Sequence, residues 1–203
     1  VQSFGVKAHA FALDLRVPDS FEAFIGQATK RCPHLRALVN NAGVPSLGKP
    51  AIETSEQDWD DVVNVNLKGT WFLTLSFGRW LIANSHSGGV VSLSSTHGLV
   101  GFAGASVYGI SKAGVAHMTR MLAIEWAQHG IRVNAIAPGT TWTESRAPRL
   151  SDPTRKKMML DRIPMGRFGT VQDVAESVAY LISAQSSYMT GQVFPLDGGL
   201  TAQ

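Results

Sequence analysis

The chain has 203 residues, of which 44% are hydrophobic and 16% are charged. This composition fits an ordinary globular chain that can bury a sizeable core, and it excludes disordered, collagen-like and membrane-spanning classes. The formal net charge is +3, and the basic residues are scattered instead of gathered in a tail, so nucleic acid is not expected as a partner. We expect a single domain over residues 1–203.

A single cysteine, Cys32, excludes an intramolecular disulfide and a cysteine-rich metal site. One cysteine suits a reducing compartment, so we expect a cytoplasmic location and no metal ion. Residues 1–5 contain no initiator Met and no charged segment followed by an apolar one. We therefore expect neither a signal peptide nor a natural start at this end.

Strands and helices alternate along the first part of the chain. A strand is predicted over 7–15, where apolar and polar residues alternate, and a helix over 21–32 follows a Pro-Asp-Ser stretch that can cap it. An apolar run at 35–39 enters an Asn-Asn-Ala-Gly turn at 40–43, which is typical of a buried parallel strand.

The next helical pattern begins at a predicted capping box, in which Thr54 bonds to the amide of Gln57 and Gln57 reaches back. The pattern is amphipathic as far as Leu81, and Gly69 marks a change of path near its middle. A β-branched strand is then predicted over 90–93, and polar residues follow its end.

The second half repeats the alternation of helix and strand. A long helix is predicted over 106–129 and closed by Gly130, and a strand follows over 131–136. A helix is predicted over 170–182 with Thr170 as its N-cap, and a last strand over 192–196. Residues 140–168 lack a regular pattern and are long enough to form a substrate-binding lid. Such alternation predicts an α/β fold with a parallel sheet covered on both faces, in which ligands lie at the carboxyl ends of the strands.

Tyr108 and Lys112 form the first candidate catalytic pair, because residues four apart on one helix project from the same face. Alone the pattern is weak, since a Tyr-x-x-x-Lys pair is expected by chance about 0.1 times in this chain. Ser95 ends the strand before this helix, and Asn66 lies on an earlier helix, so two more polar candidates accompany the pair.

These residues and the motifs around them resemble the short-chain dehydrogenase/reductase family in its compact, single-domain form. The matching segments occur in the family's order and at its spacing over essentially the whole chain. They are Asn40-Asn41-Ala42-Gly43, Asn66-Leu67-x-Gly69, Ser94-Ser95, Tyr108-x-x-Ser111-Lys112, Asn134-x-x-x-Pro138-Gly139 with Thr143, and Asp197-Gly198-Gly199. The resemblance implies a Rossmann-like, doubly wound parallel sheet. It also implies an NAD(P)-dependent oxidoreductase that interconverts an alcohol and a ketone or aldehyde by hydride transfer.

The family's mechanism fits the chemistry of these side chains. A phenol, with a reference pKa of about 10, needs a nearby cation to act as a base, and Lys112 with the oxidised nicotinamide would supply that charge. Tyr108 would then serve as general acid/base, and Ser95 would hydrogen-bond the substrate oxygen. The resemblance implies that Asn66 fixes a water that connects Lys112 to solvent, and the hydride belongs to the cofactor.

The resemblance also implies a set of cofactor contacts. Asp14 and Leu15 would lie at the adenine ring and Asn40 near the adenosine ribose, whereas Tyr108 and Lys112 would hold the nicotinamide ribose. Further cofactor-binding positions are Ala42, Gly43, Pro138, Gly139, Thr141 and Thr143. Of these, Thr141 and Thr143 would hold the carboxamide, although Val or Ile is commoner than Thr at the first of the two positions.

A complete member of the family opens with a strand, a Thr-Gly-x-x-x-Gly-x-Gly turn, a helix and a second strand, ahead of the segment that matches 7–15. The chain contains none of these, so we expect it to be part of a protein of about 250 residues. The preference between NAD and NADP cannot be read, because the selecting residue belongs to that segment. The sheet would lack two strands between 7–15 and 35–39, which leaves 35–39 as an unpaired edge.

Two other functions remain open at this point. The chain could be a catalytically silent Rossmann-fold binding or scaffold protein, or an epimerase or lyase that shares the Tyr-x-x-x-Lys pair. We expect a small-molecule alcohol or carbonyl substrate, no membrane, and a homodimer or homotetramer through helices at 67–84 and 108–129, by resemblance only. We expect His97, two residues beyond Ser95, to be an exposed loop residue outside the catalytic set.

Overall fold

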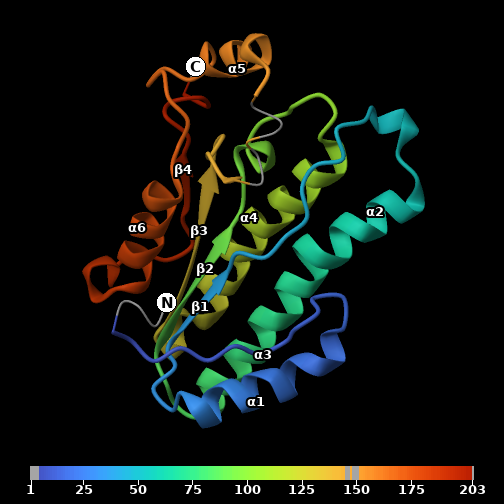
Figure 1. Cartoon of the computed structure of the whole chain (residues 1–203). Helices are drawn as coiled ribbons and strands as arrows, with labels where there is room; N and C mark the ends of the chain where they lie inside the picture. Colours follow the sequence, from blue (N-terminus) through green and yellow to red (C-terminus); the bar gives the residue numbers. More distant parts are fainter. Residues whose placement is uncertain (1–4, 145–146, 148–150, 203) are drawn as a thin grey trace.

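The computed structural model describes residues 5–144, 147 and 151–202. Within these residues the strands form a four-stranded sheet in which every neighbouring pair is parallel (Figure 1). Its order is β1 (Ala37–Asn40), β2 (Gly88–Leu93), β3 (Ile131–Pro138) and β4 (Val193–Leu196). Every strand therefore ends at the same edge of the sheet, which confirms the predicted α/β class.

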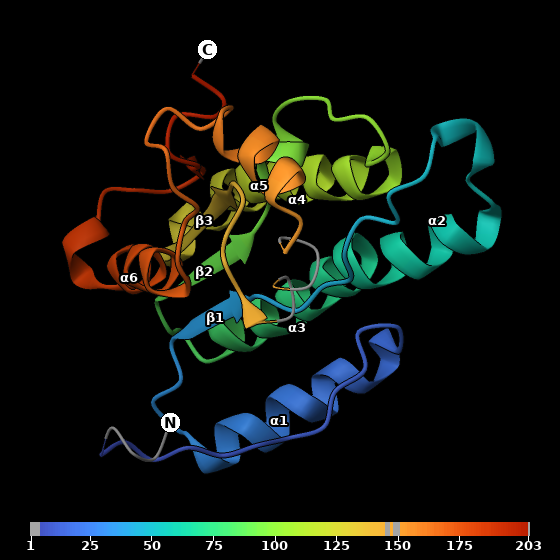
Figure 2. The same ribbon diagram turned by 45° about the horizontal axis from the view of Figure 1, so that its top comes forward.

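Helices lie on both faces of this sheet. They are α1 (Phe21–Arg31), α2 (Glu56–Val63), α3 (Thr70–Ala83), α4 (Ser106–Trp126), α5 (Pro153–Leu160) and α6 (Val171–Ile182). Figures 1 and 2 show α3 and α4 on one face, with α1 beyond α3, and α6 on the other face. No helix of the described segments is long and apolar enough to span a membrane.

The core has two parts because successive side chains of a strand point to opposite faces. Val90 of β2 belongs to a cluster with Phe77 of α3 and Leu122 of α4, whereas the next residue, Val91, packs with Leu181 of α6. All these side chains are buried. Burial on both faces explains why β2 reads as a continuous apolar run instead of an alternating one.

The strand predicted over 7–15 is wrong: none of the described residues 5–15 lies in a strand. This segment packs through its side chains instead, with Phe11 edge-on to Phe24 of α1 at 6.2 Å between ring centroids. Leu13 and Leu15 rest against the cluster under α1 and α3. Figure 2 shows the segment running along α1, away from the sheet. A strand forms only where a neighbour supplies ladder hydrogen bonds, and none is within reach here.

The other predicted helices and strands form, with small shifts at their ends. Ser20 does not cap α1 with its side chain; residues Pro18–Ser20 form a 3-10 turn that leads into it. The capping box of α2 lies one residue later than predicted, at Ser55 and Asp58. Asp58 accepts the backbone N–H of Ser55 at 2.8 Å and also pairs with Lys49, whereas Thr54 closes the preceding turn.

The change of path near Gly69 is a π-helical turn at Asn64–Gly69, between α2 and α3. A Cβ at Gly69 would overlap the carbonyl of Leu15, so only glycine lets the N-terminal segment pass this close. A π-helical turn changes which side of a helix a residue faces. Asn66, near the middle of this turn, is thereby directed into the protein, where it is 1% exposed.

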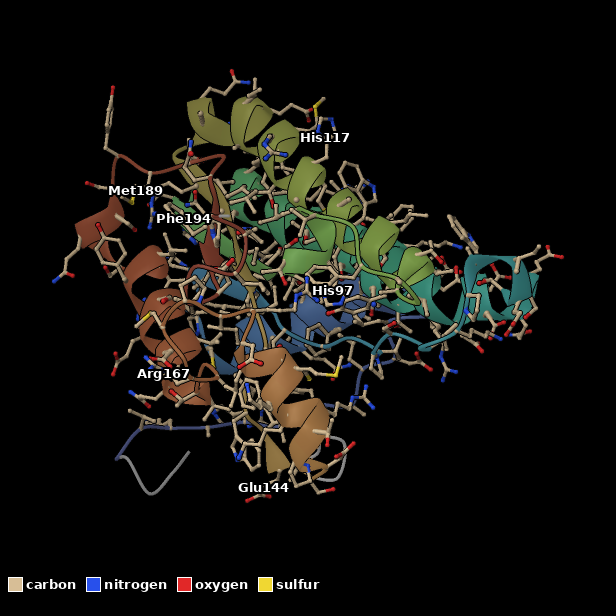
Figure 3. The ribbon with its side chains drawn as sticks, turned by 90° about the horizontal axis from the view of Figure 1, so that it is seen from above. His97, His117, Glu144, Arg167, Met189 and Phe194 are labelled. Carbon is tan, nitrogen blue, oxygen red and sulfur yellow. The ribbon has the colours of Figure 1, made fainter. Side chains whose placement is uncertain are left out.

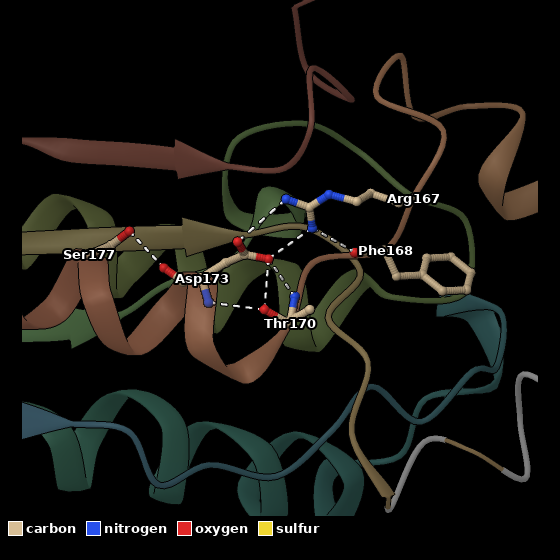
Figure 4. A network of polar contacts seen from close by, with 5 residues as sticks. All are labelled: Arg167, Phe168, Thr170, Asp173 and Ser177. Carbon is tan, nitrogen blue, oxygen red and sulfur yellow. Dashed lines mark hydrogen bonds and ion pairs between the residues drawn. The ribbon is translucent and has the colours of Figure 1, made fainter.

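Two predicted helix ends are confirmed. Gly130 follows α4 and a short 3-10 turn with a φ of 68°, the left-handed conformation that glycine adopts without strain. Thr170 caps α6: its hydroxyl accepts the N–H of Asp173, whose carboxylate accepts the N–H of Thr170 at 2.7 Å (Figure 4). Arg167 donates to the same carboxylate and holds its pKa well below the usual range.

The irregular region at 140–168 is held near both of its ends by backbone hydrogen bonds. The N–H of Trp142 donates to the carbonyl of Gly169, and the N–H of Met165 donates to Gly198. Between these anchors the described part contains α5, which lies above the carboxyl ends of the strands in Figure 1. Residues 145–146 and 148–150 of the predicted lid lie outside the described residues.

Candidate active site

The candidate catalytic residues come from three elements that meet at the carboxyl edge of the sheet. Ser95 follows the end of β2, Tyr108 and Lys112 lie on successive turns near the start of α4, and Asn66 lies in the π-helical turn. Hydrogen bonds and ring contacts, some of them through Leu93, Ser111 and His97, connect these residues into one cluster. The structure thus brings together four residues that are up to 46 positions apart in the sequence, between Asn66 and Lys112.

Lys112 is held with its ammonium group inside the protein. The side chain is 6% exposed, and Nζ donates to the backbone carbonyl of Leu93 at 2.7 Å. On the same two elements, the Ser94 hydroxyl donates to the Lys112 carbonyl at 2.8 Å, so β2 and α4 are joined twice. Burial lowers the pKa of Lys112 from 10.5 to about 8. About nine-tenths of the lysines would still be charged at pH 7.

Tyr108 lies beside this cation. Lys112 Nζ is 5.8 Å from the centroid of the Tyr108 ring, a distance at which a cation is attracted to an aromatic face. The backbone carbonyl of Tyr108 accepts the Ser111 hydroxyl at 2.7 Å, which helps to fix this turn of α4. The arrangement places a positive charge where it can stabilise a phenolate.

Asn66 connects the turn after β1 to α4. Its side-chain amide exchanges two hydrogen bonds with the backbone of Val44, at 2.8 and 3.0 Å, and lies 3.4 Å from the Ser111 hydroxyl. Gly43 is packed so closely here that an added Cβ would be 2.9 Å from Asn66 Oδ1 and 3.6 Å from Lys112 Nζ. Gly43 therefore lies close to both Asn66 and Lys112, and its role in binding the cofactor stays a prediction.

Ser95 and His97 face each other in the turn after β2. Ser95 is 7% exposed, its Oγ accepts the backbone N–H of His97 at 3.2 Å, and it lies 3.3 Å from His97 Nδ1. The His97 ring is also edge-on to Tyr108, at 5.6 Å between centroids. His97 is half-buried, so the expectation of an exposed loop histidine is wrong: the ring packs inward against the aromatic side chains.

The first cofactor positions differ in how much their side chains could offer a ligand. The Asn40 amide already donates to Thr74 and Ser92, at 2.8 and 3.0 Å, so this side chain holds the end of β1 in place. The Asp14 carboxylate is engaged by the Arg16 guanidinium at 2.7 Å, and this partner lowers the pKa of Asp14 to about 2. Leu15 packs against the core cluster. These residues would contact a ligand through their backbone groups, or through side-chain atoms that the bonds described here do not use.

The remaining cofactor positions lie at the ends of β1 and β3. Ala42 is in the turn after β1, and Gly139 donates its N–H to Leu196 at 3.0 Å immediately after Pro138. A Cβ at Gly139 would be 2.9 Å from the Cβ of Asp197, so the two strand ends are in tight contact. Thr141 forms an isolated bridge with Gly169.

Sequence reasoning missed the Leu93 carbonyl, because a backbone acceptor has no signal in side-chain identity. It also missed the place of Ser111 between Asn66 and Tyr108, although Ser111 stands inside the quoted Tyr-x-x-Ser-Lys motif. In the part of the chain that the structure describes, no group of three His, Cys, Asp or Glu side chains is placed to hold a metal ion.

Comparisons with known proteins show which family the chain resembles. A family model described as enoyl-(acyl carrier protein) reductase matches residues 1–201. The 2-dehydro-3-deoxy-D-gluconate 5-dehydrogenase of Escherichia coli is 36% identical over 203 residues, which cover 100% of this chain and 80% of that protein. The 3-oxoacyl-[acyl-carrier-protein] reductase of Thermotoga maritima is 39% identical over 197 residues, 96% of this chain and 77% of that protein.

A solved structure of a candidate 2-deoxy-D-gluconate 3-dehydrogenase from Agrobacterium tumefaciens, with bound NADP, is similar with a TM-score of 0.90 and 37% identity. The similarity covers 100% of this chain and 80% of that one. The chain belongs to the short-chain dehydrogenase/reductase family, and its relatives and structural neighbours are NAD(P)-dependent dehydrogenases. This confirms the resemblance, the Rossmann-type fold and the oxidoreductase class.

Proposed function

We propose that this protein interconverts a secondary alcohol and its ketone with NAD or NADP, and that Tyr108 is the general acid/base. The observation that carries the proposal is the buried Lys112 ammonium, 5.8 Å from the Tyr108 ring and held by the Leu93 carbonyl. A neutral carbonyl leaves the positive charge of Lys112 uncancelled, so that charge can act on Tyr108.

The chain's own residues carry the proton chemistry. In ketone reduction the Tyr108 hydroxyl donates its proton to the substrate oxygen while Ser95 hydrogen-bonds the same oxygen. Lys112 then stabilises the phenolate that remains, and Asn66 completes the path by which this group regains a proton. In alcohol oxidation the Tyr108 phenolate takes the alcohol proton, so each residue works in the reverse direction.

The donor set fits a nicotinamide nucleotide. A phenol and an ammonium on one helix face can hold the hydroxyls of a ribose, and the glycine turn at 40–43 lets backbone approach a ligand closely. When bound, the nicotinamide supplies or accepts the hydride. Lys112 and Tyr108 would hold its ribose, with Ala42 and Gly43 beside it. Pro138, Gly139, Thr141 and Thr143 would lie at its carboxamide end.

Further features of the proposal concern the whole molecule. We propose that residues 140–168, anchored at Gly169 and Gly198, cover the substrate as a lid within one domain, because α5 lies over the strand ends. A homodimer or homotetramer through the long helices fits Ile110, Met121 and Ile124, which leave apolar surface exposed on α4. A reducing, cytoplasmic compartment fits the single cysteine.

A comparison of the unchanged protein with Tyr108→Phe tests the proposal. The purified protein is given D-gluconate with NAD or NADP in one direction, and acetoacetyl-coenzyme A with the reduced nucleotide in the other. Loss of the hydroxyl should lower kcat by about 100-fold or more, because the proton donor is removed. Equal turnover by the two proteins would refute the role of Tyr108.

A further inference from the structure

The side chain of His97 contacts both Ser95 and Tyr108. Its ring is stacked on Phe102, with 4.2 Å between centroids and 26° between planes, and its edge meets Tyr108. The Arg162 guanidinium lies over the same Phe102 ring, 5.0 Å from its centroid. Figure 3 shows His97 near the middle of the molecule, below the start of α4. Two aromatic rings thus hold the imidazole in one orientation toward Ser95.

The Ser95 hydroxyl has one proton to give and two lone pairs to offer. One lone pair accepts the backbone N–H of His97 at 3.2 Å. The 3.3 Å contact with His97 Nδ1 takes either the second lone pair or the proton, according to the tautomer of the imidazole. If Nδ1 lacks hydrogen, Ser95 donates to it, and the serine proton points away from the substrate.

If Nδ1 carries hydrogen, the Ser95 proton points toward the substrate instead. Both lone pairs of Ser95 Oγ are then occupied by donors from His97, and the serine proton is the only group left for the substrate oxygen. This is the arrangement that stabilises developing negative charge on that oxygen in either direction of the reaction.

We propose that His97 is a positioning residue that acts through Ser95: its Nδ1–H donates to Ser95 Oγ and directs the serine proton toward the substrate oxygen. This inference rests on the role proposed above for Ser95. His97 needs no contact with substrate or cofactor for this task. The effect should depend on the hydrogen bond from His97 to Ser95 and not on the bulk of the side chain.

Leucine and asparagine replace His97 with side chains of nearly equal shape, and both remove the stacking on Phe102. Only asparagine places an N–H near the position of Nδ1. His97→Leu should lower kcat by about tenfold with KM changed by less than about twofold, the value of one lost hydrogen bond in the transition state. His97→Asn should keep kcat within about threefold of the unchanged protein. The same exchange at His34, an exposed residue in the turn between α1 and β1, is the matched control and should change neither parameter.

A double-mutant cycle separates this inference from the proposed function, measured with whichever of D-gluconate and acetoacetyl-coenzyme A the protein turns over faster. In the Ser95→Ala background, His97→Leu should have no further effect on kcat. If Ser95→Ala leaves kcat unchanged, the proposed role of Ser95 is wrong and the inference falls with it. If Ser95→Ala lowers kcat but the two effects multiply, or His97→Leu is as active as His97→Asn, only the inference is overturned.

Nitrogen NMR of the histidine side chains tests the same point without turnover. The His97 resonances are identified by their loss in His97→Asn. We expect a proton on Nδ1, and we expect those resonances to shift in Ser95→Ala. A ring protonated on Nε2 alone would overturn the inference.

Discussion

The Lys112 ammonium donates to the backbone carbonyl of Leu93 at 2.7 Å, and this contact joins the start of α4 to the end of β2. The partner is a neutral carbonyl, so the charge is desolvated without being cancelled, and burial lowers the pKa of Lys112 to about 8. The charged Lys112 side chain is central to the proposed chemistry. Its burial nevertheless lowers the stability of the folded protein.

Replacement of Lys112 by Met should stabilise the protein and inactivate it. The folded protein holds the lysine proton less tightly than the unfolded chain, so the buried charge costs about 3 kcal/mol below pH 8. Loss of the Leu93 hydrogen bond offsets part of the gain, and the free energy of unfolding should rise by about 1–2 kcal/mol at pH 7. Turnover should fall by about 100-fold or more. Urea unfolding and steady-state assays measure the two effects.

The extra stability of Lys112→Met should decrease as the pH rises. Between about pH 8 and 10.5 the unfolded state of the unchanged protein binds more protons than the folded state, so its stability increases with pH across that window. The advantage of Lys112→Met should therefore shrink as the pH rises from 8 toward 10. An advantage that stays constant over this range would show that the ammonium carries no desolvation cost.

Gly43→Ala should damage the site because an added Cβ would lie 2.9 Å from Asn66 Oδ1. Asn66 is buried and bonded to Val44, so it cannot move without losing those bonds. We expect a loss of about 1–3 kcal/mol in stability and a lower kcat. Gly26→Ala is the control: nothing lies within 4 Å of its added Cβ in α1, and it should stabilise by about 0.5–1 kcal/mol. Thermal unfolding measures the stability of both variants. Equal changes in stability would contradict the packing described at Gly43.

Ser55→Ala should destabilise the protein by about 1 kcal/mol, because Ser55 accepts the N–H of Asp58 and caps α2. Thr54→Ala should change the free energy of unfolding by less than about 0.5 kcal/mol, since the Thr54 hydroxyl donates to the Pro50 carbonyl over a long 3.5 Å. Chemical denaturation of the pair gives the answer. A larger loss of stability in Thr54→Ala than in Ser55→Ala would show that Thr54 caps the helix, as predicted from the sequence.

Much of the fold could be predicted because helices and buried parallel strands have local signals. The run at 90–93 and the Gly130 stop needed only neighbouring residues to be recognised. The strand predicted over 7–15 failed because alternation describes a face, whereas a strand also needs a partner for its backbone. The capping box moved by one residue because both Gln57 and Asp58 can reach back, and the carboxylate, paired with Lys49, forms the stronger bonds.

The site shows the same division between side-chain and backbone signals. Tyr108, Lys112, Ser95 and Asn66 could be chosen as candidates from the sequence because their spacing carries a family pattern. The Leu93 carbonyl and the π-helical turn that directs Asn66 inward were not found, because they depend on backbone geometry. His97 was misplaced because its burial results from stacking on Phe102 and Tyr108, which spacing alone does not show.

A single-turnover experiment tests the central claim, that this protein transfers a hydride with Tyr108 as its acid/base. The protein is mixed with one equivalent of reduced nicotinamide nucleotide and excess acetoacetyl-coenzyme A, and nicotinamide absorbance and product are followed together. We predict that absorbance falls in step with alcohol formation, and that Tyr108→Phe abolishes both changes. Product that forms while the absorbance stays constant would contradict the account, because the cofactor would then be returned unchanged, as in an epimerase or lyase.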